Sequence, residues 1–455
     1  MRPDRRQPAR GRVRAPWAPS ALAAVAAVAA VLLAPAEARA TPGGAAGAGA
    51  GVAASNASLA QVFTLLTHDM EWGGTRPHLV RFETPVAVGL EGPGAARFAD
   101  FVDGYLDRLR RRSGIDIARR RHGQNLHVRF VGRSFERTAP GISCFVVAGD
   151  VAWKRFAADP RGHDGRRLAE ARAIGHMTVF IPAAAPAHRV RSCLVEEIAQ
   201  ALGPANDLYG LGPTIFNDDD AHFWPTELDH LMLRVLYSDA LRTGMDRATT
   251  ERAARQVLDR INPAGLAAPA LPLPQQRRMA DWRQRLQGAF EPGLDARAAA
   301  RRAAEAASIA AARTPGSAYH CHSMVALAQL AERGAAARPL EALDAADAVC
   351  RRAHGAGDIR LAWIGLMRAQ LMLDLRRHGE AAELAGQVLP AFLASGQTEP
   401  AAAARKAQDA ALSALGRHPE ARAMGRAAGV LRSLRLAGGR AAVPATAGSA
   451  FARQR

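Results

Sequence analysis

The sequence has little cysteine, few aromatic residues and almost no lysine. Only Lys154 and Lys406 are lysines among the 60 basic residues, and aromatic residues make up 5% of the 455 residues. The formal charge of +18 therefore comes from arginine, in a chain that is also rich in alanine, glycine and proline. The arginines are scattered, so we interpret them as solvated helix faces and expect no nucleic-acid partner; polyanion binding is the alternative.

Several catalytic motifs are also absent. The sequence contains no G-x-S-x-G, phosphate-binding loop, Rossmann glycine pattern or C-x-x-C motif. After residue 40, no apolar run approaches the ~20 residues that a membrane span needs. Apolar residues still make up 49% of the chain, which is enough to build the cores of two or three domains.

Residues 1–40 have the pattern of a secretory signal. A basic segment over 2–14 precedes a short apolar segment over 21–33, and Ala38-Arg39-Ala40 is a small-residue cleavage site. Residues 41–54 are mainly glycine and alanine, which predicts a flexible linker. We expect the mature chain to be exported, to the periplasm or the extracellular space, and to contain no transmembrane segment.

The four cysteines are divided evenly between the two halves of the chain. Cys144 and Cys193 lie in the first half, and Cys321 and Cys350 lie in the second. An even number of cysteines in an exported chain indicates disulfides. We predict that Cys144 pairs with Cys193 and Cys321 with Cys350.

The fold class is predicted to be α+β, followed by an all-α region. Over residues 55–262, hydrophobic periodicity predicts a helix at 95–112. A further helix that carries Glu196 and Glu197 is expected after the strands. Strands are expected at 79–88, 126–131, 142–147 and 177–181. Residues 263–290 are expected to be a linker, and residues 436–455 a disordered tail.

The predicted helical region, residues 291–435, contains a weak internal repeat. Glu-Ala pairs end the segments Arg338–Ala342, Arg377–Ala381 and Arg417–Ala421, at separations of 39 and 40 residues. In each, a short turn precedes a helix that begins near the Glu-Ala pair. The pattern resembles tetratricopeptide-like helical hairpins, and a plain antiparallel helical bundle is the alternative.

The most informative run is C-L-V-E-E-I-A-Q-A-L-G-P-A-N-D, residues 193–207. On a helix, Glu196 and Gln200 share one face because they are four residues apart. Gly203 is expected to end that helix with a sharp turn. Asn206 follows three residues after the glycine, and Asp207 comes next.

The spacing of this run resembles the metzincin protease signature H-E-x-x-H-x-x-G-x-x-H/D. Glu196, Gln200 and Asn206 stand at the three zinc-ligand positions, and Glu197 stands at the general-base position. One carboxylate and two amides make a poor zinc site, so we expect no metal and no other cofactor. We favour a structural hydrogen-bond network; the alternatives are ligand or peptide binding by Glu196, Gln200, Asn206 and Asp207, and a catalytic metal.

A second segment, residues 225–237, predicts a helix with Thr226 as its N-cap and Asp229 completing a capping box. The preceding stretch 214–220 lacks the methionine of a metzincin. Its Asp218–Asp220 run is interpreted as a solvated acidic loop, with calcium binding as the alternative. With the E-E-x-x-Q-x-L-G-x-x-N-D run, these features resemble an uncharacterised bacterial secreted family, a domain of unknown function. The resemblance implies an exported, zincin-like domain and no particular activity.

From these features we predict a non-catalytic, exported protein of the cell envelope that binds a peptide or protein partner. The alternative is an atypical hydrolase in which Glu197 acts as general base without a standard zinc site. A third possibility is that the first domain is structural and the helical hairpins bind the partner. The sequence gives no indication of the oligomeric state.

Overall fold

The computed structural model describes residues 52–70, 74–139, 143–160, 162, 169–217, 221–275, 278–291, 293–331, 338–418 and 420–421. The predicted signal, most of the predicted linker at 41–54, the Asp218–Asp220 run and the predicted tail lie outside these residues. No helix within the described ranges is long and apolar enough to cross a membrane.

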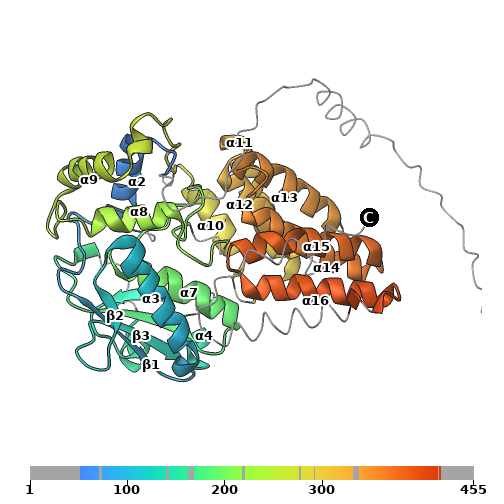
Figure 1. Ribbon diagram of the computed structural model, residues 1–455, viewed down its shortest axis with the longest axis horizontal. Helices are drawn as coiled ribbons and strands as arrows, with labels where there is room; N and C mark the ends of the chain where they lie inside the picture. Colours follow the sequence, from blue (N-terminus) through green and yellow to red (C-terminus); the bar gives the residue numbers. More distant parts are fainter. Residues whose placement is uncertain are drawn as a thin grey trace, which may run out of the picture. The chain divides into compact units, whose positions relative to one another are not determined.

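A five-stranded mixed sheet is the framework of the first part (Figure 1). Its strands are β1 (Val86–Glu91), β2 (Ile117–Arg119), β3 (Leu126–Val131), β4 (Phe145–Ala148) and β5 (Met177–Pro182). The strand order is β2-β1-β3-β5-β4. All neighbouring pairs are parallel except β4 and β5, which are antiparallel, so β4 forms an antiparallel edge.

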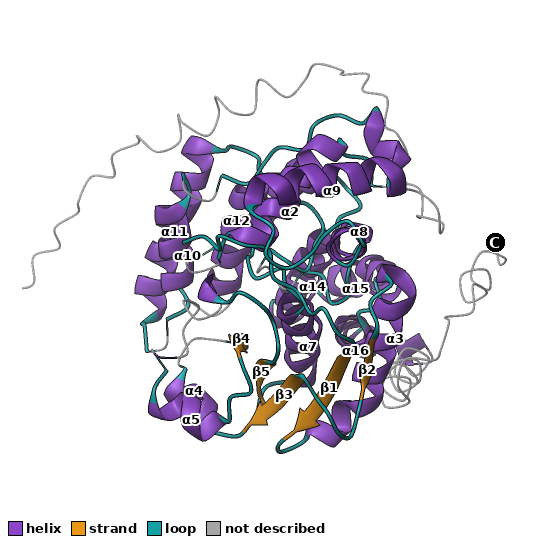
Figure 2. Cartoon of the chain, turned by 90° about the vertical axis from the view of Figure 1, so that its left-hand side faces the viewer, coloured by secondary structure: helices purple, strands orange, loops and turns teal. Residues whose placement is uncertain are grey.

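The two faces of the sheet differ because side chains alternate along each strand. On one face, Val88, Val128 and Val179 join the main core with residues of α3 (Ala99–Ser113) and α7 (Ala187–Ala201). On the other face, Phe180 of β5 packs with aromatic side chains of the short helices α4 (Ser134–Thr138) and α5 (Trp153–Ala158). Figure 2 shows the strands with these short helices at one end.

Three further helices complete the first part: α2 (Asn56–His68), α8 (Glu227–Leu236) and α9 (Arg247–Ile261). Asn56 donates a hydrogen bond to Asp259 over 2.9 Å, which ties the start of α2 to the end of α9. Arg112 of α3 forms an ion pair with Glu227 at the start of α8. Contacts between residues that are far apart in the sequence therefore hold these helices together.

The second part is a series of helices in which each packs on its neighbours in sequence. They are α10 (Ala280–Gly288), α11 (Ala296–Arg313), α12 (Ala318–Leu330), α13 (Pro339–His354), α14 (Ile359–Asp374), α15 (His378–Ala394) and α16 (Thr398–Ala414). Small residues such as Ala346, Ala385 and Ala404 are buried at the contacts, so the helices approach closely. The predicted Cys321–Cys350 disulfide is present and joins α12 to α13.

The helical part contacts two loops of the first part. Tyr209 meets Trp282 of α10 with ring centroids 5.4 Å apart, and both belong to one buried cluster with Tyr319. Farther along the chain, Gln397 donates a hydrogen bond to the Ala221 carbonyl over 2.8 Å. The loops that follow α7, the helix that carries Glu196 and Glu197 and is called the signature helix below, are thus packing surfaces for the helical part.

The predicted elements and the observed ones differ at several places, and α2, α4, α5 and α9 were not predicted. β1 begins later than the strand expected at 79–88. Leu79 forms its backbone hydrogen bonds with Gly244 and Met245, which lie in a loop, and not with a neighbouring strand. β2 was not predicted; with three residues it is too short for a periodic signal. The segment 263–290, expected to be a linker, contains the 3₁₀ helix η4 (Pro263–Leu266) and α10. The other three predicted strands are confirmed to within a few residues.

Candidate functional site

The signature run lies on the second half of α7 and in the turn that follows it. α7 ends at Ala201, and Gly203 has a φ of 141°, a conformation that L side chains rarely adopt. A Cβ atom at Gly203 would lie 2.8 Å from the carbonyl oxygen of Val80. The expectation that Gly203 ends the helix with a sharp turn is therefore confirmed, and the reason is close contact with a neighbouring backbone.

Two side chains from other elements hold this turn by its carbonyl groups. Arg76 donates to the Gly203 carbonyl over 3.1 Å, and the Tyr237 hydroxyl donates to the Leu202 carbonyl over 2.9 Å. Burial lowers the pKa of Arg76 to about 10, which leaves its guanidinium charged at neutral pH. Residues from both sides of the signature thus fix where Asn206 and Asp207 lie.

The candidate site residues are mostly enclosed. Glu197 is 5% exposed and Gln200 is 9% exposed, while Asn206 and Asp207 are 0% and 3% exposed. Glu196 is half-buried. A general base must reach the proton that it removes, so the burial of Glu197 argues against a bulky substrate approaching it directly.

Hydrogen bonds connect Gln200 and Asn206 to the interior. The Gln200 amide donates to Asp207 over 2.9 Å, which links the helix to the residue after the turn. The Asn206 amide donates to the Leu65 carbonyl of α2 over 2.8 Å. The structure therefore brings Gln200 and Asp207 together and ties Asn206 to a different helix.

The donor set does not fit zinc. Zinc sites in proteins use imidazole, thiolate and carboxylate ligands, whereas two of the three ligand positions here hold neutral amides. The nitrogen atoms of both amides already donate to protein acceptors. Within the described ranges, no group of three or more His, Cys, Asp or Glu residues is arranged to hold a metal ion. No catalytic step through a metal follows from these residues.

The second predicted segment forms α8, and its capping box is confirmed. The Thr226 hydroxyl accepts from the Asp229 N–H, and Asp229 accepts from the Thr226 N–H over 2.7 Å. Asp229 also accepts from the Ile215 N–H and the Thr214 hydroxyl. Burial raises the pKa of Asp229 to about 6, while the bonds from the two threonines act in the opposite direction. One carboxyl thus joins the start of α8 to the loop after the signature.

The predicted Cys144–Cys193 disulfide is present. Cys193 lies one turn before Glu197 on α7, and Cys144 immediately precedes β4. The disulfide therefore fixes the antiparallel edge of the sheet beside the signature helix.

A second polar cluster, which sequence reasoning missed, lies on the face of the sheet opposite α7. Arg129 of β3 forms ion pairs with Glu91 over 3.2 Å and with Asp150 over 2.7 Å. The signal was the alternation of His127 and Arg129 with Val128 and Phe130. It predicts a strand, but polar residues at alternate positions also mark a face that no helix fully covers.

One comparison with known proteins gives a match. Residues 56–256 match the family described as Protein of unknown function (DUF2927). Neither the curated proteins nor the solved structures contain a match to the chain. The matched range holds the sheet, the signature helix and α8, and ends before the helical part.

Proposed function

We propose that this chain is an exported, non-catalytic, zincin-like protein that binds an extended peptide segment of a protein partner at the outer edge of β4. The observation that carries the proposal is the position of β4. It is an edge strand, and a disulfide holds it beside the signature helix.

The order of elements supports the zincin-like part of the proposal. β1, α3 and the strands β2 to β5 precede the signature helix, and this strand, helix, strands order is the one expected for the N-terminal subdomain of zincin-type proteases. In addition, α2 comes before β1, and the short helices α4 and α5 lie between the later strands. The short β2 adds one strand to that order. The turn at Gly203 and the following α8 come in the sequence that the resemblance implies.

The amide and carboxylate side chains support a non-catalytic role. Gln200 is bonded to Asp207, Asn206 is bonded to Leu65, and Glu197 is buried. These contacts stabilise the turn after α7, which is the role of a structural network. The signal pattern of residues 1–40 and the two disulfides support export.

The edge strand supports peptide binding. In an antiparallel edge strand, alternate residues direct their N–H and C=O groups away from the sheet. Within the described ranges, β5 is the only strand that pairs with β4. An added peptide strand would gain main-chain hydrogen bonds there. The tetratricopeptide-like helices α13 to α16 would supply a second protein-binding surface.

The non-catalytic part is tested by metal analysis and a general peptidase assay of the mature protein. We expect well under ~0.1 zinc per chain, since amides are poor zinc ligands. We also expect the wild type and Glu197→Gln to show the same background activity. Stoichiometric zinc, together with activity that is lost in Glu197→Gln, would establish the hydrolase instead.

Peptide binding is tested with peptides selected from a random display library on the full mature chain. Val146→Pro and Val147→Pro each remove one N–H from β4, on opposite sides of the strand. One variant loses a bond to β5 and should melt at a lower temperature. The other should keep its melting temperature and bind the selected peptides about tenfold more weakly, since it lacks one outward hydrogen bond. Unchanged affinity in that second variant would exclude binding at this edge.

A further inference from the structure

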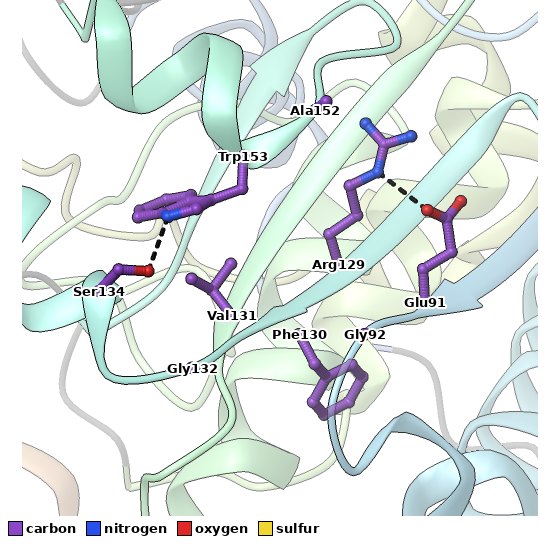
Figure 3. A pocket seen from close by; sticks show the side chains of 9 residues that line it. All are labelled: Glu91, Gly92, Arg129, Phe130, Val131, Gly132, Ser134, Ala152 and Trp153. Carbon is purple, nitrogen blue, oxygen red and sulfur yellow. Dashed lines mark hydrogen bonds and ion pairs between the residues drawn. The ribbon is translucent and has the colours of Figure 1, made fainter.

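A pocket of about 340 Å³ lies on the sheet face opposite the signature helix. Its walls are the Trp153 indole on one side and the Arg129–Glu91 ion pair on the other, with Val131 between them (Figure 3). Ser134 and Ala152 complete the side near the indole. The volume lies within the range of small-ligand sites in proteins, about 300–1,000 Å³.

The pocket lies where the sheet topology favours a ligand site. Glu91 and Val131 are the last residues of the parallel neighbours β1 and β3. After β1 the chain continues to β2 on one side, and after β3 it continues to β4 and then β5 on the other. Ligands of parallel sheets bind where the carboxyl ends of two strands meet such a divergence.

A glycine keeps the loop after β1 close to β3 at this point. Gly92 has a φ of 93°, and a Cβ atom there would lie 2.1 Å from the Phe130 carbonyl oxygen. No other residue fits this position without moving the loop that forms one side of the pocket.

The charged groups at the pocket leave a negative charge in excess. Glu91 and Asp150 both bond to the single guanidinium of Arg129. The two carboxylate side chains are 49% and 53% exposed, whereas Arg129 is 16% exposed. The two carboxylates and the guanidinium together carry a formal charge of −1, and the His127 ring lies 3.6 Å from Glu91 and 3.8 Å from Asp150. Glu91 and Arg129 line the pocket, and Asp150 is bonded to Arg129 beside it. Of the two charged residues that line the pocket, Glu91 is therefore more accessible to a ligand than Arg129.

The aromatic wall is held rigidly. The Trp153 indole N–H donates to the Ser134 hydroxyl over 2.9 Å, which fixes the plane of the ring. Phe135 stacks on the indole with ring centroids 5.5 Å apart, and Phe180 meets it edge-on at 5.1 Å. A rigid indole opposite a carboxylate is suited to a cation, because the face of the ring attracts positive charge.

We propose that this pocket binds an organic cation of the size of an arginine or lysine side chain, with its charge near Glu91 and its stem against Trp153. This site is separate from the β4 edge and stands whether or not a peptide binds there. The cation belongs either to a residue of a peptide or to a free amine, and both have the same charged group.

The test uses N-acetyl-L-arginine amide as the probe and N-acetyl-L-citrulline amide as its neutral match, with affinities measured by calorimetry on the full mature chain. We expect the arginine probe to bind at least tenfold more tightly than the citrulline probe. Agmatine distinguishes the two sources: equal affinity for agmatine points to a free amine, and weaker affinity points to a peptide residue. Equal binding of the arginine and citrulline probes, or no binding of either, overturns the proposal.

Two variants locate the site. Glu91→Gln keeps the size of the side chain and removes its charge, and Trp153→Leu removes the aromatic wall; each should weaken the arginine probe about tenfold. Glu305→Gln is the matched control, because Glu305 is 52% exposed and pairs with Arg285 in the helical part. If Glu91→Gln folds normally and binds as tightly as the wild type, the pocket is not the site.

Discussion

At the scale of single residues, two buried histidines make the first part sensitive to acid. Burial lowers the pKa of His68 to about 4 and that of His230 to about 3. His68 lies at the end of α2, where its ring nitrogens are 3.1 Å from the Arg76 carbonyl and 3.1 Å from the Thr250 hydroxyl. Below pH ~6.5 these histidines are protonated in the unfolded chain but stay neutral in the folded chain. The free energy of unfolding therefore falls as the pH drops.

His68→Gln should therefore reduce the pH dependence of unfolding. Between pH 7 and pH 5, the free energy of unfolding of the wild type should fall by about 2 kcal/mol more than that of the variant, because 1.36 kcal/mol corresponds to one pKa unit. The pKa of Asp229 is about 6 in the folded chain, so its protonation raises the free energy of unfolding as the pH drops. This contribution is the same in the wild type and in the variant and cancels in the comparison. Urea denaturation at the two pH values measures the difference.

The matched control for this prediction is His122→Gln. His122 is exposed, so replacing it should leave the pH dependence of the wild type unchanged. If His68→Gln keeps the full pH dependence, His68 is not protonated selectively on unfolding.

The network around the signature was predictable only in part from single residues. Amides at positions 200 and 206 predict hydrogen bonds in place of a metal, and Gln200 does bond to Asp207, seven residues away. The partner of Asn206 is a carbonyl on α2, 141 residues away. A contact between such distant parts of the chain is set by tertiary packing, which no local pattern encodes.

At the scale of elements, the turn after α7 depends on Gly203. Gly203→Ala should lower the free energy of unfolding by at least ~2 kcal/mol, because it adds both backbone strain and a contact with the Val80 carbonyl. Gly114→Ala is the comparison for a positive-φ glycine without such a contact: Gly114 ends α3 with a φ of 72°, close to the left-handed region that L residues can reach, and nothing lies within 4 Å of its added Cβ. Equal losses in the two variants, measured by thermal unfolding, would show that the contact at Val80 contributes nothing.

Elements with a strong periodic pattern were the ones that the sequence predicted well. α3 and α8 were expected from apolar residues three and four positions apart, and the Thr226 capping box marks the start of α8. α7 was expected from the spacing of the signature run. The stretch around Leu79 has the composition of a strand, yet it pairs with the loop at Gly244. Composition alone does not distinguish a strand from an extended segment that packs on a loop.

At the scale of the whole molecule, the described residues from 52 onward form one compact unit. Tyr209 lies between the two parts, where it contacts the Trp282 ring and accepts a hydrogen bond from Gln287. The loops that follow the signature helix are therefore unlike an open substrate-binding surface. They are a platform on which the helical part packs.

Tyr209→Ala should separate the unfolding of the two parts. We expect the wild type to unfold in one calorimetric transition, and the variant to unfold in two, because a buried aromatic contact of about 3–5 kcal/mol is lost where the parts meet. Phe392→Ala is the control: Phe392 is buried within the helical part, so this change should lower stability without producing a second transition of the first part. Two transitions in the wild type would contradict the prediction.

The connectivity of the two disulfides has a consequence for how the chain matures. The first cysteine is bonded to the second and the third to the fourth, across 49 and 29 residues. Four cysteines can pair in three ways, and this is the arrangement that arises when thiols are oxidised in the order in which they emerge N-terminus first. A chain with this connectivity would reach its native bonds by simple oxidation, with no need for an isomerase to exchange one bond for another.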